Sequence, residues 1–194
     1  MRIGVLGLQG AVREHQRSLA RLGIDAVVVK HAAALARLSA LIFPGGESTA
    51  ISLLATGAFL EELRRRAQGG FPLFGTCAGM ILLAKEIEGQ KEAHICAIDI
   101  TVARNATGRQ VESFETSLQV EGIGRDIPAV FIRAPYITRV GDGVTVLARR
   151  EGIPVMARQG NVLVASFHPE LTDDLRVHAY FASMVAEHDK EVRA

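Results

Sequence analysis

One cysteine of the chain stands in a setting that favours nucleophilic chemistry. Cys77 lies between Gly75 and Gly79, directly between an apolar run typical of a strand and a segment typical of a helix. This is the Gly-x-nucleophile-x-Gly pattern of a nucleophile elbow, with cysteine in the place of serine. The tight turn predicts a strained backbone at Cys77 and a helix N-terminus that favours the thiolate. It also predicts an oxyanion donor in the N–H of Ala78.

The alternative interpretation of Cys77 is a plain core position, because cysteine is among the most frequently buried residue types. The elbow pattern favours the nucleophile. Cys96 has no such pattern around it, and we assign it to the core. Two cysteines in these contexts predict neither a disulfide framework nor a zinc site.

A thiol nucleophile needs a base, and the base needs a group that fixes its tautomer. Of the six histidines, His168 directly follows a late apolar run. Ligands of open α/β sheets bind at the carboxyl ends of the strands, so we expect His168 and Cys77 to share that edge. Glu170, two residues on, can orient the imidazole and complete a triad. A loop histidine with a structural role is the alternative, and we expect His15, in a helix rich in Arg and Glu, to face solvent.

A glycine-rich turn follows another apolar run, in the sequence Pro-Gly-Gly-Glu-Ser-Thr of residues 44–49. Paired glycines let backbone N–H groups approach a ligand closely, so this turn can supply a second oxyanion donor. An ordinary turn in which Ser48 caps the next helix is the alternative. The turn is too short for a Walker loop and lacks the lysine, which excludes nucleotide binding here.

Short apolar runs alternate with amphipathic segments, which is typical of an α/β fold with an open, mostly parallel sheet flanked by helices. The first half predicts strands at 3–8, 26–29, 40–43 and 71–74, and helices at 12–22, 49–54, 59–66 and 78–87. The second half predicts strands at 98–102, 117–120, 129–132, 144–148, 154–157 and 162–166, and a helix at 173–187. We expect Thr172 or Asp173 to cap that helix. No linker or repeat divides the chain, so residues 1–194 predict a single domain.

The composition limits the classes of function. The 194 residues are 48% hydrophobic and 22% charged, with a formal net charge of +1, which excludes the disordered class. The charge balance favours neither nucleic acid nor an anionic membrane as a partner. No apolar run approaches the roughly 20 residues of a spanning helix, and polar residues interrupt the N-terminal run too early for a signal peptide. We expect a cytoplasmic protein with no metal or cofactor site.

The elbow and the His-Pro-Glu segment together resemble the class I (triad) glutamine amidotransferases. Further segments resemble the branch of that family whose members are glutaminase subunits of pyridoxal 5'-phosphate synthase, and the resemblance runs along essentially the whole chain. These segments are Leu6-Gly7-Leu8-Gln9-Gly10, residues 44–49, Arg104-Asn105 with Gly108-Arg109-Gln110, Ser113-Phe114-Glu115, and Phe131-Ile132-Arg133-Ala134-Pro135. Ile81 stands where many class I members have glutamine, which also fits this branch.

The resemblance implies a flavodoxin-like glutaminase fold in which Cys77 attacks the glutamine side chain and a glutamyl thioester is hydrolysed. It implies that the partner is a barrel-shaped synthase subunit, in a large hetero-oligomer, with Gln9 and Gly10 in the segment that responds to it. It implies Gly46 and Ala78 as oxyanion donors. The glutamine contacts that it implies are Gly46, Glu47, Ser48, Arg104, Ile132 and Arg133.

Three other interpretations stay open at this point. A γ-glutamyl hydrolase, or the glutaminase of histidine biosynthesis, would share the triad and differ in the Gln9-Gly10 and 104–115 segments. A non-catalytic regulatory subunit on the same scaffold would usually lack a triad member. A redox-sensing cysteine protein would have no need of the His-Pro-Glu segment.

Overall fold

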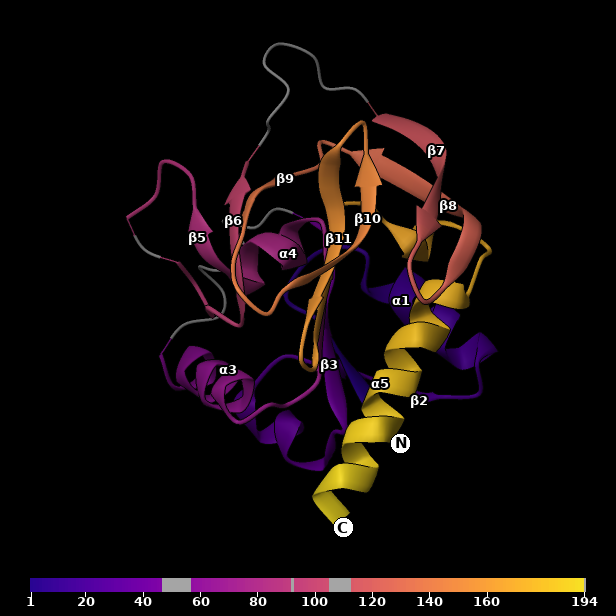
Figure 1. The fold of residues 1–194 in the computed structure, drawn as a ribbon. Helices are drawn as coiled ribbons and strands as arrows, with labels where there is room; N and C mark the ends of the chain where they lie inside the picture. Colours follow the sequence, from indigo (N-terminus) through magenta and orange to yellow (C-terminus); the bar gives the residue numbers. More distant parts are fainter. Residues whose placement is uncertain (47–56, 92, 105–112, 194) are drawn as a thin grey trace.

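A seven-stranded sheet forms the centre of the molecule (Figure 1). The structure is a computed structural model and describes residues 1–46, 57–91, 93–104 and 113–193. Across the sheet the order is β10-β11-β12-β4-β3-β1-β2. The strands are β1 (Arg2–Leu6), β2 (Asp25–Val29), β3 (Ala40–Phe43), β4 (Leu73–Thr76), β10 (Thr145–Arg150), β11 (Ile153–Gln159) and β12 (Val162–Ala165). Only the pairs β10–β11 and β11–β12 in this sheet are antiparallel, which confirms the predicted class.

Helices cover both faces of this sheet. Figure 1 shows α1 and α5 on one side and α3 and α4 on the other. The helices are α1 (Val12–Arg21), α3 (Ala58–Gln68), α4 (Ala78–Leu83) and α5 (Arg176–Arg193), with short 3-10 turns η1 (Ala32–Arg37) and η2 (Pro169–Leu171). Side chains alternate along the strands, so Val5 and Ile42 pack with α1 and α5 while Leu41 and Phe43 pack with α3 and α4. Each face therefore has its own apolar core.

Two small sheets flank the central one. The first has the order β5-β6-β9, from β5 (Ala84–Ile87), β6 (Ile98–Ala103) and β9 (Tyr136–Val140), and the second is the hairpin of β7 (Ser113–Val120) and β8 (Gly124–Ile132). The predicted helix at 78–87 is therefore wrong beyond Leu83. Ala84 turns extended, with φ −61° and ψ 145°, because the chain from there pairs with β6. Strand β9 was not predicted.

The other predicted elements are present with shifted ends. Strands β7, β8 and β11 are longer than predicted, and β4 runs from Leu73 to Thr76. Helix α5 begins at Arg176, where the Asp174 carboxylate accepts the backbone N–H of Arg176 at 2.9 Å. The cap prediction for Thr172 or Asp173 is wrong, because Asp173 faces arginines of α1 instead. The helix predicted at 49–54 lies outside the described residues.

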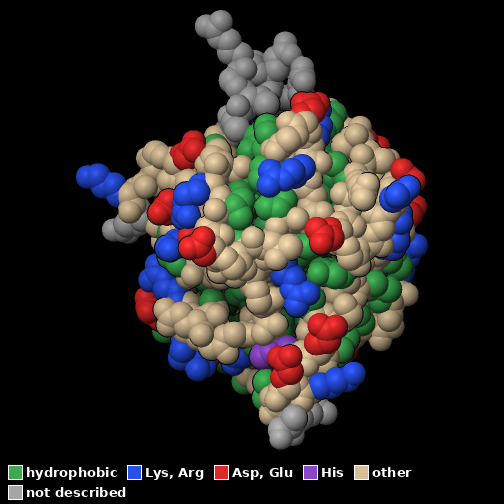
Figure 2. All heavy atoms as spheres, viewed as in Figure 1, with side chains coloured by type: hydrophobic (Ala, Val, Ile, Leu, Met, Phe, Trp, Pro, Cys, Tyr) green, Lys and Arg blue, Asp and Glu red, His purple; other side chains and the backbone are tan. Residues whose placement is uncertain are grey.

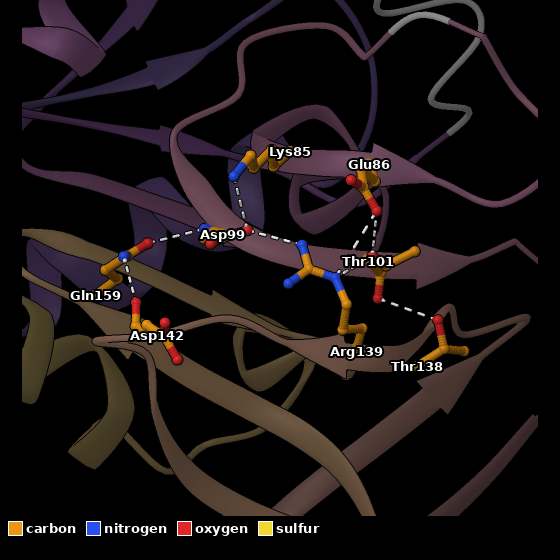
Figure 3. A network of polar contacts seen from close by, with 8 residues as sticks. All are labelled: Lys85, Glu86, Asp99, Thr101, Thr138, Arg139, Asp142 and Gln159. Atoms are coloured by element: carbon orange, nitrogen blue, oxygen red, sulfur yellow. Dashed lines mark hydrogen bonds and ion pairs between the residues drawn. The ribbon is translucent and has the colours of Figure 1, made fainter.

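A polar network joins the first small sheet to the central one (Figure 3). The Asp99 carboxylate of β6 accepts hydrogen bonds or ion pairs from Lys85 at 3.2 Å and Arg139 at 2.8 Å. The side chain of Gln159 in β11 accepts the backbone N–H of Asp99 at 2.8 Å and donates to the carbonyl of Asp142. Exposed ion pairs contribute little stability, so the bonds of Gln159 to backbone groups are the firmer link between the sheets.

The surface carries both signs of charge. Basic and acidic side chains lie intermixed over the face shown in Figure 2.

Within the described ranges, none of the helices combines the length and the apolar character needed to cross a membrane.

The packing of α4 on β3 generates a prediction about stability. A Cβ on Gly79 would lie 2.0 Å from the Phe43 carbonyl oxygen, and backbone cannot move away as a flexible side chain can. We expect Gly79→Ala to lower the free energy of unfolding by about 2–3 kcal/mol, as overpacking does. Urea unfolding followed by circular dichroism measures this. Gly69→Ala is the matched control, because its nearest neighbour would lie at 3.4 Å, and equal midpoints for the two variants would contradict the argument.

Candidate active site

The structure contains the predicted elbow at Cys77. Strand β4 ends one residue before the cysteine and α4 begins one residue after it. Cys77 has φ 48° and ψ −107°. Residues other than glycine enter this region only at a cost in conformational energy. Its backbone N–H donates to the Ala165 carbonyl at 2.8 Å, so the turn is pinned to the neighbouring strand. The strain and the position both match the prediction.

The two glycines of the elbow are required by close backbone contacts. A Cβ on Gly75 would lie 2.6 Å from the carbonyl carbon of Gly79, and one on Gly79 would meet the Phe43 carbonyl. Helix α4 therefore approaches both β4, at Gly75, and β3, at Gly79, more closely than any side chain allows. The approach sets the direction in which the cysteine leaves the turn.

His168 and Glu170 follow strand β12 and lie beside the cysteine. The His168 backbone N–H donates to the Val130 carbonyl at 2.8 Å, which fixes the segment against β8. The His168 Nδ1 to Glu170 Oε1 distance is 2.8 Å, and both side chains are buried. The imidazole and the Cys77 side chain both lie against Gly45, where a Cβ would be 2.2 Å from His168 Cε1 and 3.3 Å from Cys77 Cβ. The three residues thus form one continuous arrangement at the carboxyl ends of β4 and β12.

The charges of this arrangement support one another. Burial by itself lowers the pKa of His168, but hydrogen bonds with Cys77 and Glu170, together with their charges, outweigh it and raise that pKa to about 10. Burial likewise opposes ionisation of Glu170, yet the neighbouring His15 and His168 hold its pKa below the usual value. The arrangement is therefore a carboxylate that carries an imidazolium between itself and the thiol.

The glycine-rich turn after β3 lies against both Cys77 and His168. Gly45 lies so near that a Cβ there would be 2.2 Å from His168 Cε1 and 3.3 Å from Cys77 Cβ. The Gly45 N–H donates to Thr76 Oγ1 at 3.1 Å, and its carbonyl accepts the Ala11 N–H at 3.1 Å. Ala78 is the first residue of α4, so its N–H has no acceptor within the helix ladder.

A cavity of about 430 Å³ opens over the cysteine. Most of the predicted site residues that the structure describes line it, together with Ala11, Gly45, Ile81, Pro135 and Leu171; the predicted ones are Gly10, Gly46, Cys77, Ala78, Arg104, Ile132, Arg133 and His168. Glu170 lies behind His168, away from the cavity. Gln9 is exposed on the turn next to Gly10. The predicted contacts Glu47 and Ser48 lie outside the described residues.

Residues at the end of strand β8 form one wall of the cavity. The Ile132 carbonyl lies 3.8 Å from Cys77 Sγ, and Arg133 turns out of the strand with φ 47°. This positive φ marks a bend that ends β8 beside Cys77. The residues that line the cavity thus extend from Gly10, after β1, to Leu171, after β12.

Two expectations about side-chain environments are wrong. His15 was expected to face solvent, but it is completely buried, because α1 turns His15, Ser18 and Leu19 toward the sheet at helical spacing. Cys96 was expected in the core and is exposed, with φ 60°. Sequence reasoning also missed Thr76 and His178, which contact His15; the spacing of His15 from Ser18 and Leu19 was the available signal.

Comparison with known proteins agrees with this geometry. The model of the SNO glutamine amidotransferase family matches residues 5–187. Sequences described as pyridoxal 5'-phosphate synthase subunit PdxT, from Bacillus cereus (strain B4264) and Bacillus mycoides (strain KBAB4), are 57% identical over 188 residues and 96% of each chain.

Solved structures show the same fold. A crystal structure described as a glutamine amidotransferase has a TM-score of 0.91 and 52% identity, and the match covers 96% of this chain and 100% of the other. A structure described as PurLQS from Thermotoga maritima shares the fold with a TM-score of 0.73 at 16% identity, and that match covers 94% of this chain and 97% of the other. The match of the family model to most of the chain, and the relatives at 57% identity, show that the chain belongs to the SNO glutamine amidotransferase family.

Proposed function

We propose that the chain hydrolyses L-glutamine to L-glutamate and ammonia, with Cys77, His168 and Glu170 as its catalytic triad. The observation that carries this proposal is the hydrogen bond of 2.8 Å between Glu170 and His168, with His168 and Cys77 together lining the cavity. A thiol, a base and an orienting carboxylate in this order are the parts that acyl transfer needs. Membership of a glutamine amidotransferase family supplies the amide substrate.

The steps follow from the positions of the groups. The Cys77 thiolate attacks the side-chain amide carbon of glutamine, and the charge that develops on the oxygen is met by backbone N–H groups of Ala78 and Gly46. His168 then gives its proton to the amide nitrogen, so ammonia leaves and a glutamyl thioester remains. Water, deprotonated by His168, attacks the thioester carbon. Glutamate departs and the thiolate is restored.

The rest of the cavity fits the ends of an amino acid. Arg104 and Arg133 are cationic and line the opening, and a guanidinium binds a carboxylate through paired hydrogen bonds. The Ile132 backbone lies beside the sulfur. We assign these residues, with Gly46, Glu47 and Ser48, to contacts with the glutamine.

We further propose that the ammonia serves a synthase subunit that makes pyridoxal 5'-phosphate, since relatives at 57% identity are described as a subunit of that synthase. The partner would be barrel-shaped, the complex a large hetero-oligomer in the cytoplasm, and this chain a single domain of it. Gln9 and Gly10 would respond to the partner. The contact of Gly10 with Gly45 and Gly46, and the bond from Ala11 to Gly45, support this role, because they join that turn directly to the oxyanion loop.

The proposed function makes glutamate release depend on both Cys77 and the partner. We expect slow glutamate release by the chain alone and a rise when the candidate synthase subunit is added. Cys77→Ala should lower kcat by more than about 10⁴-fold, because the covalent route is lost, without weakening partner binding. Cys96→Ala is the control and should behave as wild type. Activity of Cys77→Ala near that of wild type would remove Cys77 from the mechanism, and strong activity without the partner would fit a stand-alone hydrolase.

The second prediction concerns the orienting carboxylate. Glu170→Gln keeps the shape of the side chain but removes the charge that favours the imidazolium. We expect kcat to fall by about 10²- to 10⁴-fold, less than for Cys77→Ala. Steady-state glutamate release in the presence of the partner measures this. A variant as active as wild type would exclude an orienting role for Glu170.

The third prediction concerns protonation. His168 has a pKa of about 10 in the folded chain, above the reference value near 6.5, so protonation of His168 stabilises the fold below about pH 6.5. That contribution is lost as the pH rises through about 10. Nitrogen-15 NMR should show His168 as an imidazolium at pH 8, whereas the lowered pKa values of His15 and His178 keep both neutral. Titration of His168 near pH 6.5 would contradict the ion-pair description.

A further inference from the structure

A row of buried polar side chains continues behind the proposed triad. His15 of α1, Thr76 at the end of β4 and His178 of α5 are each completely shielded from solvent. His178 Nε2 lies 3.0 Å from His15 Nδ1, His15 Nε2 lies 3.2 Å from Thr76 Oγ1, and Thr76 Oγ1 lies 3.4 Å from Glu170 Oε1. The row therefore ends on the same carboxylate oxygen that holds His168.

The environment of the row is apolar and closed. The Phe74 ring packs edge-on against both imidazoles, with centroid distances of 6.2 Å to His15 and 6.1 Å to His178. Neither His15 nor Thr76 lines the cavity over Cys77. The row thus cannot touch a ligand bound there, and it acts on the site only through Glu170 or the backbone.

The hydrogen bonds of the row have one consistent direction. The Thr76 hydroxyl accepts the Gly45 N–H at 3.1 Å and has one hydrogen to give, which the Glu170 carboxylate attracts. His15 then donates from Nε2 to Thr76, with Glu170 Oε1 also at 3.5 Å from this nitrogen. Its Nδ1 is left as the acceptor for His178 Nε2–H. The opposite direction would turn a nitrogen lone pair toward the carboxylate.

A second observation favours the same direction. Among the described residues, His178 Nδ1 has no hydrogen-bond partner. In the assigned direction this nitrogen is an acceptor, whereas in the reverse direction it would be a buried N–H without an acceptor, which is the rarer and costlier state.

We propose that Thr76 and His15 are positioning residues of the glutaminase site, which orient Glu170 through an aligned chain of hydrogen bonds from His178 and so hold His168 against Cys77. The inference rests on the proposed function for its activity readout. Aligned donors polarise one another and point their positive ends at the carboxylate. A Glu170 so held cannot rotate away from His168 Nδ1, and the imidazole keeps the orientation that proton transfer requires.

Thr76 is the junction of the row. It precedes the nucleophile by one residue, accepts the N–H of Gly45 in the oxyanion loop and donates to Glu170. One hydroxyl therefore connects the elbow, the loop and the carboxylate. His15 has the same character in α1, which begins directly after the Gly10 turn, and its backbone N–H donates to the Ala11 carbonyl at 3.3 Å.

Two matched pairs of variants test the proposal in the full chain with the synthase subunit present. Thr76→Val keeps the β-branched shape and removes the hydroxyl, whereas Thr76→Ser keeps the hydroxyl. His15→Asn carries its amide near the Nδ1 position, which faces His178, whereas His15→Gln carries its amide near the Nε2 position, which faces Thr76. The exposed His31→Gln is a control for loss of a histidine.

We expect Thr76→Val and His15→Asn to lower kcat about tenfold or more, the size of one lost hydrogen bond to a buried charge. In His15→Asn, KM for glutamine should change by less than about twofold, because, among the described residues, the His15 side chain has no hydrogen bond to one that lines the cavity. Thr76→Ser and His15→Gln should retain most of the rate. Wild-type kcat in both Thr76→Val and His15→Asn, or equal losses in the conservative partners at unchanged folding, would overturn the proposal.

A readout that needs no glutamine separates this inference from the proposed function. In a Cys96→Ser background, the rate of Cys77 alkylation by iodoacetamide at one fixed pH reports how His168 is held beside the sulfur, and proton NMR reports the His168–Glu170 hydrogen bond. The titratable groups around His15 are Glu170 and His168, His178 of α5 and Glu14 of its own helix.

We expect the alkylation rate to fall and the His168 proton signal to shift in Thr76→Val and His15→Asn alone. An unchanged rate and signal in both variants would overturn the positioning role, whatever the chain hydrolyses. Absent glutamine hydrolysis in wild type, with these shifts present, would overturn the proposed function and leave the positioning role standing. If Thr76→Val does not fold, the His15 pair decides alone.

Discussion

The parallel order of four neighbouring strands is the constraint on which the site depends. The strands β12, β4, β3 and β1 lie side by side in one direction, so the four turns that follow them meet at one edge. Those turns carry the His-Pro-Glu segment, the cysteine elbow, the paired glycines and the Gly10 turn. Because Ala165 stands opposite Thr76 in the register, the histidine and the cysteine leave the sheet at the same level.

Two features of the site are energetically unfavourable, and other parts of the fold compensate for them. A residue held at positive φ and a carboxylate kept ionised in the interior are both unfavourable by themselves. The backbone bond from Cys77 to Ala165 opposes the first, and the donors Thr76 and His168 on Oε1 of Glu170 oppose the second. Both compensations come from neighbouring strands and from the turns that follow them. The site is therefore as stable as the strand pairing beneath it.

The sequence was sufficient where the chemistry is local. The elbow, the strand before it and the His-Pro-Glu turn each fall within a few residues, and each could be predicted from glycine spacing and apolar runs. The sequence was insufficient where the structure of a residue depends on a segment distant in the chain that packs against it. Residues 84–87 look like the continuation of a helix and become a strand because β6 lies beside them. The charged neighbours of His15 hid its burial, which is set by the helices and strands that cover it.

The walls of the cavity are fastened unequally. On one side the backbone N–H of Cys77 is bonded to β12 and that of His168 to β8. Both side chains are therefore carried by backbone that is fixed to strands. On the other side the described hydrogen bonds of Gly45 are one from the start of α1 and one to a threonine hydroxyl. A displacement of the Gly10 turn would therefore reach Gly45 through the Ala11 bond without passing through the strands that hold Cys77 and His168. One wall of the cavity thus belongs to the sheet, and the opposite wall is linked to the start of α1.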